Sequence, residues 1–281
     1  MRWLRRFLWL LAFLLLTVGT QIGGIAMLVS HLLARLAPRR WRATGWRRAA
    51  TGFVAFALVY AVATVAVVPP LAALGGRAPL RCFPTDDAPY GALSVLYCAS
   101  NRHYARQPLH DLVAALAADL SAAHPGSEVR YLDAGLPFFD WFPLIPHITH
   151  RDGLKLDLAF LYEDLDGSYV PGLAPWPVGY WAYDQPRPGE RQPCADHVDP
   201  GFSLRWDMAW LQPLLPPYAV DIERTGFMAR WLVAEGPAHG LRRMLLEPHL
   251  ADRWGVAGGP LGFQGCRAGR HDDHIHISVQ G

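Results

Sequence analysis

Two segments of the chain place histidine beside acidic residues, and they lie far apart in the sequence. The first reads HITHRDGLKLDL, from His147 to Leu158, and the second reads HDDHIHISV, close to the C-terminus. Imidazole nitrogen and carboxylate oxygen both bind zinc, and a catalytic zinc site usually has three protein ligands and one open position. His150, Asp157 and His276 would supply such a set. The alternative is that both segments are solvated polar loops.

The elements around these segments must bring the candidate ligands together. Side chains two positions apart on a strand point to the same side, so His274 and His276 share one face of a predicted final strand, HIHISV. One of them can then bind a metal while the other lies beside the open position. Residues 154–162 alternate and predict a second strand, on which Asp157 faces away from the leucines. A turn at Gly153 would bring the preceding histidine to this strand.

Both segments resemble a known family. HITHRDGLKLDL resembles the H-x-S-H-R-x-G-L-D-V-D signature of penicillin-insensitive murein endopeptidases, and HDDHIHI resembles the H-D-D-H-x-H segment that ends their catalytic domain. LDAGLP, residues 132–137, is similar to the strand and turn before the first signature. The likeness covers residues 128–162 and 218–279. The family belongs to a wider group, with lysostaphin-type and D-alanyl-D-alanine peptidases, whose members share a small zinc-bearing antiparallel sheet.

The resemblance implies three zinc ligands and three further active-site histidines. The sequence departs from the signature in places: Thr149 replaces serine, Lys155 stands where an acid is common, and FFDWFPLIP replaces a glycine-rich stretch. These departures concern the substrate rather than the ligands. The implied ligands are His150, Asp157 and His276, and the implied further histidines are His147, His271 and His274.

The implied chemistry is hydrolysis of an amide without a covalent intermediate. Bound zinc polarises a carbonyl group and makes water more acidic. The reaction also needs a base and a donor that stabilises the oxyanion. His274 and His271 are the candidates, and the sequence does not assign the two roles between them. His147 either lies behind the ligands or contacts the substrate, while Asp272 and Asp273 either orient imidazoles or form a solvated turn.

The sequence therefore predicts a zinc metallopeptidase that cleaves peptide cross-links in peptidoglycan. One alternative is a D-alanyl carboxypeptidase or an amidase acting on cell-wall peptides. Another is a zinc-stabilised wall-binding domain without activity, although a purely structural site would have no spare histidines. The motifs G-x-S-x-G and H-E-x-x-H are absent, which argues against a serine hydrolase and a thermolysin-like protease.

Composition adds a membrane anchor. The chain has 281 residues, of which 52% are hydrophobic and only 18% charged, a balance that is too apolar for an ordinary soluble protein. No charged residue occurs from residue 7 to residue 34 or from residue 49 to residue 76, and a spanning helix needs about 20 apolar residues. Pro69 and Pro70 should end the second helix. The predicted units are a membrane anchor (1–76) with spans at about 7–34 and 49–70, and an exported zinc peptidase-like domain (77–281).

The loop between the predicted spans, residues 35–48, carries six arginines and no acid. Short basic loops stay in the cytoplasm, so the domain should lie in the periplasm of a bacterium, next to inner-membrane lipid and wall peptides. A nucleic-acid patch is a poor alternative beside two spans, and the sequence identifies no protein partner. Two full spans would leave the N-terminal arginines outside, unless the first segment is re-entrant. A cleaved signal peptide at Phe7–Leu16 is a further alternative.

All four cysteines follow the second predicted span. An even number of cysteines in an exported domain suggests two disulfides. The short separation of Cys82 and Cys98 favours a bridge between them, with a second bridge between Cys194 and Cys266. A zinc site built from cysteine is disfavoured because no C-x-x-C spacing occurs.

The rest of the exported domain predicts an α+β fold around an antiparallel sheet. Residues 163–217 are rich in proline, glycine and tryptophan and predict an insertion on the substrate side. The tryptophans at 176, 181, 206 and 210 are interpreted as core residues, with a substrate groove as the alternative. The predicted helices are 109–124, 221–236 and a short one over 239–249, and the remaining predicted strand is 128–135.

Overall fold

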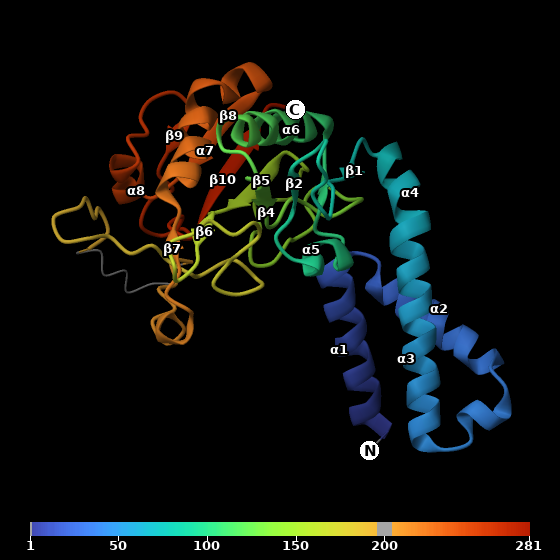
Figure 1. The fold of residues 1–281 in the computed structure, drawn as a ribbon. Helices are drawn as coiled ribbons and strands as arrows, with labels where there is room; N and C mark the ends of the chain where they lie inside the picture. The colour runs from blue at the N-terminus through green and yellow to red at the C-terminus, as the bar shows by residue number, and fades with distance from the viewer. Residues whose placement is uncertain (1, 196–203) are drawn as a thin grey trace.

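The computed structural model describes residues 2–195 and 204–281 and shows a helical bundle beside a mixed α+β domain (Figure 1). The predicted α+β class is therefore confirmed. Part of the predicted insertion, residues 196–203, lies outside the described residues.

The first apolar segment is a helical hairpin, so the single predicted helix over residues 7–34 is wrong. Helix α1 (Arg2–Thr20) ends at a turn in which Gln21 has a φ of 62°, and α2 (Gly23–Leu36) packs back against α1. The close packing requires glycine: a Cβ atom on Gly24 would lie 2.8 Å from a phenylalanine ring of α1. Small residues let two helix backbones approach, and here they close the hairpin.

The second apolar segment is one continuous helical rod. It consists of α3 (Gly45–Val62), the π-helical turn η2 (Ala63–Val67) and α4 (Val68–Leu74). The predicted end at Pro69 and Pro70 is wrong, because the prolines lie in the first turn of α4, after the π-helical turn. Proline is tolerated in a first turn, where its missing N–H leaves no bond unmade. The helices Arg2–Thr20 and Gly45–Leu74 are long and apolar enough to cross a membrane.

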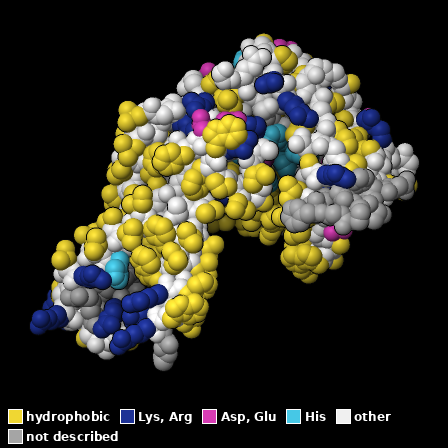
Figure 2. Space-filling model, turned by 180° about the vertical axis from the view of Figure 1, so that it is seen from behind, with side chains coloured by type: hydrophobic (Ala, Val, Ile, Leu, Met, Phe, Trp, Pro, Cys, Tyr) yellow, Lys and Arg dark blue, Asp and Glu magenta, His cyan; other side chains and the backbone are white. Residues whose placement is uncertain are grey.

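The two ends of the bundle differ in charge and in contacts. The start of α1 and the loop with η1 (Arg39–Arg42) lie together at the end away from the domain (Figure 1), and Figure 2 shows basic side chains gathered there. The other end carries the domain. The Gln21 Oε1 atom accepts a hydrogen bond of 2.8 Å from the Phe138 N–H, and the Tyr60 hydroxyl donates one of 2.7 Å to the Ala99 carbonyl.

A six-stranded sheet forms the centre of the domain, in the order β2-β4-β5-β10-β8-β9. The three inner pairs are antiparallel and the two outer pairs are parallel. The predicted antiparallel sheet is thus confirmed at its centre. The strands are β2 (Tyr90–Ala92), β4 (Val129–Tyr131), β5 (Lys155–Ala159), β10 (His274–Val279), β8 (Leu241–Leu245) and β9 (Leu261–Gly262).

The two faces of the sheet have different roles. Helices α6 (Gln107–Ala123) and α7 (Ile222–Ala234) pack on one face (Figure 1), where Leu156 and Leu158 of β5 and the isoleucines of β10 are fully buried in the core. Side chains alternate along a strand. The residues between these apolar positions therefore point to the other face, which carries the histidines of β10.

Two of the three helices predicted in the domain are confirmed, and one is wrong. The predicted helices over 109–124 and 221–236 are confirmed as α6 and α7, and the Asp221 carboxylate caps α7 by accepting a 2.9 Å hydrogen bond from the Arg224 N–H. The short helix predicted over 239–249 is wrong, since the middle of this segment, Leu241–Leu245, is strand β8. Its leucines have helical spacing, but pairing with β10 overrides that local preference.

Several short elements complete the domain. Strand β1 and helix α5 lie within residues 75–100. Strands β1 and β3 form one two-stranded sheet, and β6 and β7 form another. These elements are α5 (Val95–Ala99), α8 (Pro248–Arg253), β1 (Ala78–Pro79), β3 (Tyr104–Ala105), β6 (Tyr162–Glu163), β7 (Ala219–Val220), η3 (Gln212–Leu214) and η4 (Gly236–His239).

Two disulfides connect the four cysteines, as predicted. Cys82 is bonded to Cys98 and Cys194 to Cys266, with Cα–Cα distances of 6.0 Å and 5.5 Å. The first bridge attaches α5 to the segment before β2. The second closes a much longer loop and attaches the insertion to the segment just before β10.

Candidate metal centre

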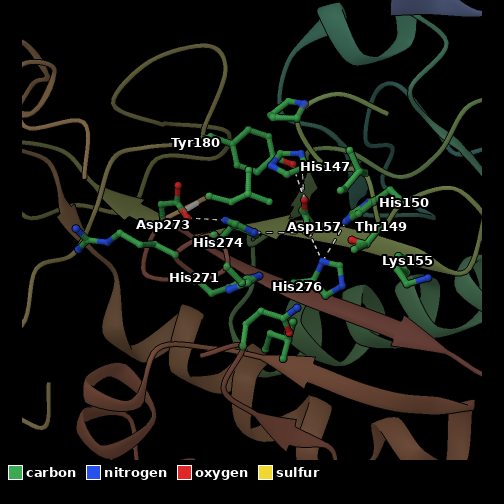
Figure 3. Close-up of a pocket in the computed structure, with 18 of the residues that line it drawn as sticks. His147, Thr149, His150, Lys155, Asp157, Tyr180, His271, Asp273, His274 and His276 are labelled. Atoms are coloured by element: carbon green, nitrogen blue, oxygen red, sulfur yellow. Dashed lines mark hydrogen bonds and ion pairs between the residues drawn. The ribbon is translucent and has the colours of Figure 1, made fainter. Parts of the chain in front are cut away.

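The three predicted metal ligands lie together on the open face of the sheet (Figure 3). His276 Nδ1 is 2.8 Å from Asp157 Oδ1, and His150 Nε2 is 3.0 Å from His276 Nδ1 and 3.2 Å from Asp157 Oδ1. All three side chains are buried. We refer to His150, Asp157 and His276 as the ligand triad.

Local structure explains how the triad forms. His276 of β10 and Asp157 of β5 are direct partners in the antiparallel register, so their side chains stand next to each other. Gly153, with a φ of 73°, makes the predicted turn before β5. The ring of His150 is fixed by a 3.0 Å contact between its Nδ1 atom and the Ala134 carbonyl oxygen.

Contacts and burial favour an ionised carboxylate and a neutral His276 in the triad. A carbonyl oxygen only accepts hydrogen bonds, so His150 Nδ1 carries the proton there and Nε2 is left with a lone pair. Burial lowers the pKa of His276 to about 4, despite the opposing effect of Asp157. Burial opposes ionisation of Asp157, but the imidazoles of His150 and His274 outweigh it and hold the pKa of this carboxyl well below its usual range. These residues could hold a metal ion.

A tyrosine holds the other oxygen of the carboxylate in the triad. The Tyr180 hydroxyl donates a 2.6 Å hydrogen bond to Asp157 Oδ2, which leaves Oδ1 for the other two members of the triad. Burial and the nearby carboxylates of Asp133 and Asp157 raise the pKa of Tyr180 well above its usual value. The hydroxyl therefore stays protonated and remains a donor. A set of two nitrogens and one oxygen, supported in this way, fits the ligand preference of zinc.

His274 lies beside the triad and is oriented by its neighbour in the sequence. His274 Nδ1 hydrogen-bonds to Asp273 Oδ1, and its Nε2 atom lies 3.6 Å from Asp157 Oδ1. The other Asp273 oxygen accepts a hydrogen bond from the Trp181 N–H. Burial disfavours the His274 cation, but Asp273 and Asp157 outweigh it and raise the pKa of His274 to about 9. The predicted orienting role of Asp273 fits this geometry.

His147 is held in the same manner, next to Tyr180 (Figure 3). Its Nδ1 atom is 2.7 Å from Asp133 Oδ2. Two nitrogens of Arg102 donate hydrogen bonds to the two oxygens of the Asp133 carboxylate. Burial disfavours the charged carboxylate, but Arg102 and His147 lower the pKa of Asp133 to about 2. His147 lies next to Tyr180, with a ring-centroid distance of 4.3 Å between the two side chains, and it also lines the cavity that opens over the triad.

His271 and Asp272 complete the predicted set but point to different surroundings. His271 is buried with its ring centroid 5.0 Å from that of His274, and burial together with the neighbouring histidines holds its pKa well below the usual value. Asp272 instead pairs with Arg270 and does not line the cavity over the triad. Both aspartates after His271 are buried. The interpretation of this segment as a solvated turn is therefore wrong.

A cavity of about 320 Å³ opens over the triad. Figure 2 shows histidine side chains at the bottom of a hollow in the domain surface. Trp181 and Trp206 line this cavity, and Trp206 and Trp210 are exposed. The interpretation of the tryptophans as core residues is therefore wrong for Trp206 and Trp210, whereas Trp181 packs against the core and also lines the cavity. The insertion supplies part of the cavity wall, as predicted.

Sequence reasoning missed three residues that hold the site in place: Arg102, Asp133 and Tyr180. Asp133 lies within LDAGLP, the stretch that resembles the segment before the first signature, so its position carried a usable signal. Arg102 and Tyr180 lie in irregular segments without periodicity, and no feature of the sequence distinguishes them from their neighbours.

Comparison with models of known protein families gives no match, and comparison with curated proteins gives none. The resemblance to murein endopeptidases therefore rests on the sequence motifs alone.

Proposed function

We propose that this protein is a zinc-dependent hydrolase that cleaves peptide cross-links in peptidoglycan. The observation that carries the proposal is the ligand triad in a cavity with two further histidines that are not needed to hold the metal. A structural zinc site is closed by four protein ligands, whereas a catalytic one keeps a position open. The motifs that supply the triad are those that resemble the murein endopeptidases.

The protein's own residues have distinct parts in this reaction. Zinc held by His150, Asp157 and His276 would polarise the scissile carbonyl and make water more acidic. His274 has its Nδ1 atom occupied by Asp273, so its Nε2 atom, 3.6 Å from Asp157 Oδ1, is the one beside the triad that would exchange a proton or donate to the oxyanion. His271 is close enough to serve in the complementary role.

The scissile bond is identified by digesting defined cross-linked muropeptides with the purified protein and weighing the products by mass spectrometry. Our proposal predicts two separated stem peptides from each cross-linked dimer. Loss of a single terminal D-alanine would identify a carboxypeptidase, and release of a whole stem peptide from its sugar would identify an amidase. If none of these products forms, the domain is better interpreted as a zinc-stabilised wall-binding module.

We also propose that the bundle anchors the domain to the periplasmic side of the bacterial inner membrane. The hairpin returns the chain to the side on which it began, so the N-terminal arginines and the basic loop share one side of the membrane. This arrangement removes the conflict that two full spans would create, because all the basic segments then obey the positive-inside rule. Helix α1, with 19 residues, is about 28 Å long, close to the roughly 30 Å hydrocarbon core.

Reporter fusions at both ends distinguish the hairpin from two full spans. Green fluorescent protein fused to the N-terminus should be fluorescent, because that end is predicted to be cytoplasmic, and alkaline phosphatase fused after Gly281 should be active. The exchanged fusions serve as matched controls and should be dark and inactive. An active phosphatase at the N-terminus would contradict the hairpin topology, and an inactive one after Gly281 would contradict the periplasmic location.

A further inference from the structure

The side chains on the open face of the sheet form rows across β5, β10 and β8. The strand register sets these rows, because residues that pair across the sheet stand side by side on one face. One row contains two members of the triad, Asp157 and His276, and ends at Leu245. The next row, two residues along each strand, consists of Lys155, Ser278 and Arg243, which we call the cationic row.

The cationic row belongs to the same cavity as the triad. Lys155, Ser278 and Arg243 all line that cavity, and Lys155 lies beyond His276, at the opposite end of the site from Asp273 (Figure 3). Neighbouring rows on one face are about 7 Å apart, because each residue of a strand advances about 3.4 Å. The row is therefore one step away from the place where a substrate carbonyl would meet the metal.

The charges of the row are available to a ligand. Arg243 has an exposed side chain, and no described residue forms an ion pair with it. Lys155 shares its charge with Asp152, and this pair is partly open to solvent. The acids that line the cavity, Asp157 and Asp273, are already engaged by histidines. The cavity as a whole thus favours an anion at this end.

We propose that the cationic row binds a carboxylate of the substrate, within two residues of the scissile bond. An extended peptide advances about 3.5 Å per residue, so a carboxylate one or two residues from the scissile carbonyl falls within reach of the long Lys155 and Arg243 side chains. A guanidinium matches the two oxygens of a carboxylate, and a neighbouring ammonium and hydroxyl add further donors. The inference rests on the proposed function and specifies its substrate: a peptide with a free carboxylate next to the bond that is cut.

The test compares two probes that differ only in this charge: N-acetyl-D-alanyl-D-alanine with a free carboxylate, and the same peptide with a carboxamide. Binding to the full-length protein in detergent is measured by isothermal titration calorimetry after metal removal, so that no turnover occurs. The wild type should bind the free acid about tenfold more tightly, as expected for two partly exposed ion pairs. The preference should fall in 1 M salt, where the screening length is about 3 Å.

Variants of the cationic row test whether these residues cause the preference for the free acid over the carboxamide. Arg243→Gln should reduce it to about threefold or less, and the double variant Arg243→Gln, Lys155→Met should abolish it. The matched control is Arg242→Gln, an exposed arginine on the same strand that does not line the cavity, and it should keep the wild-type preference. Equal affinity of the wild type for both probes, including no detectable binding of either, would overturn the inference. Retention of the preference in the double variant would also overturn it.

The test of the carboxylate site and the test of hydrolase activity can fail independently. A wild-type protein that prefers the free acid but cleaves no wall peptide would retain the carboxylate site and contradict the proposed hydrolase. A protein that cleaves muropeptides but binds the acid and the amide alike would contradict the carboxylate site alone.

Discussion

Asp157→Ala and His276→Ala are each expected to lose bound zinc and to lower the rate of cross-link hydrolysis at least about a thousandfold. Two remaining ligands hold zinc poorly, and a metal ion stabilises the transition state by several kcal/mol, where each 1.4 kcal/mol is a factor of ten in rate. Metal content is measured by inductively coupled plasma mass spectrometry beside turnover of cross-linked muropeptides. The wild type should also gain thermal stability on zinc addition, and the variants should not.

Matched controls exclude a general effect of losing an acid or a histidine. Asp166→Ala and His239→Ala remove exposed side chains outside the cavity, and both should keep the metal content and turnover of the wild type. Circular dichroism and the two disulfides report whether each triad variant is folded. A folded Asp157→Ala protein that still binds one zinc ion per chain would remove Asp157 from the ligand set.

His274→Ala is expected to separate catalysis from metal binding. The variant should keep about one zinc ion per chain, because the triad is intact, while its rate should fall by roughly 10² to 10⁴, the usual worth of a positioned proton-transfer group or oxyanion donor. Asp273→Asn should give a smaller loss, about 10- to 100-fold, because an amide has one accepting oxygen and no charge. It cannot accept from both the His274 ring and the Trp181 backbone N–H, as the carboxylate does.

The same two measurements, metal content and turnover, decide between ligand and catalyst. If His274→Ala loses its zinc while His276→Ala retains it, the assignment of these two histidines is reversed. If His274→Ala keeps both its zinc and its full rate, then His274 has no part in the chemistry, and His271 becomes the residue to replace next.

The ligand triad could be predicted from the sequence because its signals are local. Period-two alternation places Asp157 opposite the leucines of β5, and the spacing of His274 and His276 places both on one face of β10. Each signal needs only a few neighbouring residues. Neither segment alone predicts the register between β5 and β10. Two strands that each carry metal ligands can bring those ligands together in few ways other than by pairing.

Structural features that depend on contacts between residues far apart in the sequence could not be predicted. The apolar run from residue 7 to residue 34 contains no charge and no proline, so composition indicates one helix. The break at Gln21 goes with long-range contacts: Gly24 packs closely against α1, and Gln21 binds Phe138 of the domain. Strand β8 has the spacing of a helix and becomes a strand because β10 is there to pair with it. Lys155 was recognised as a departure from the family signature, but its proximity to Arg243 required the register of three strands.

Reversible dependence on zinc tests the central claim most directly. The full-length protein is assayed on cross-linked muropeptides as purified, after dialysis against a chelator, and after zinc is restored at one equivalent per chain. We expect cleavage in the first sample, loss of nearly all cleavage in the second and recovery in the third, with Asp157→Ala inactive in all three. Cleavage that persists undiminished in the zinc-free protein would contradict the account, as would a zinc-loaded wild type that leaves every cross-link intact.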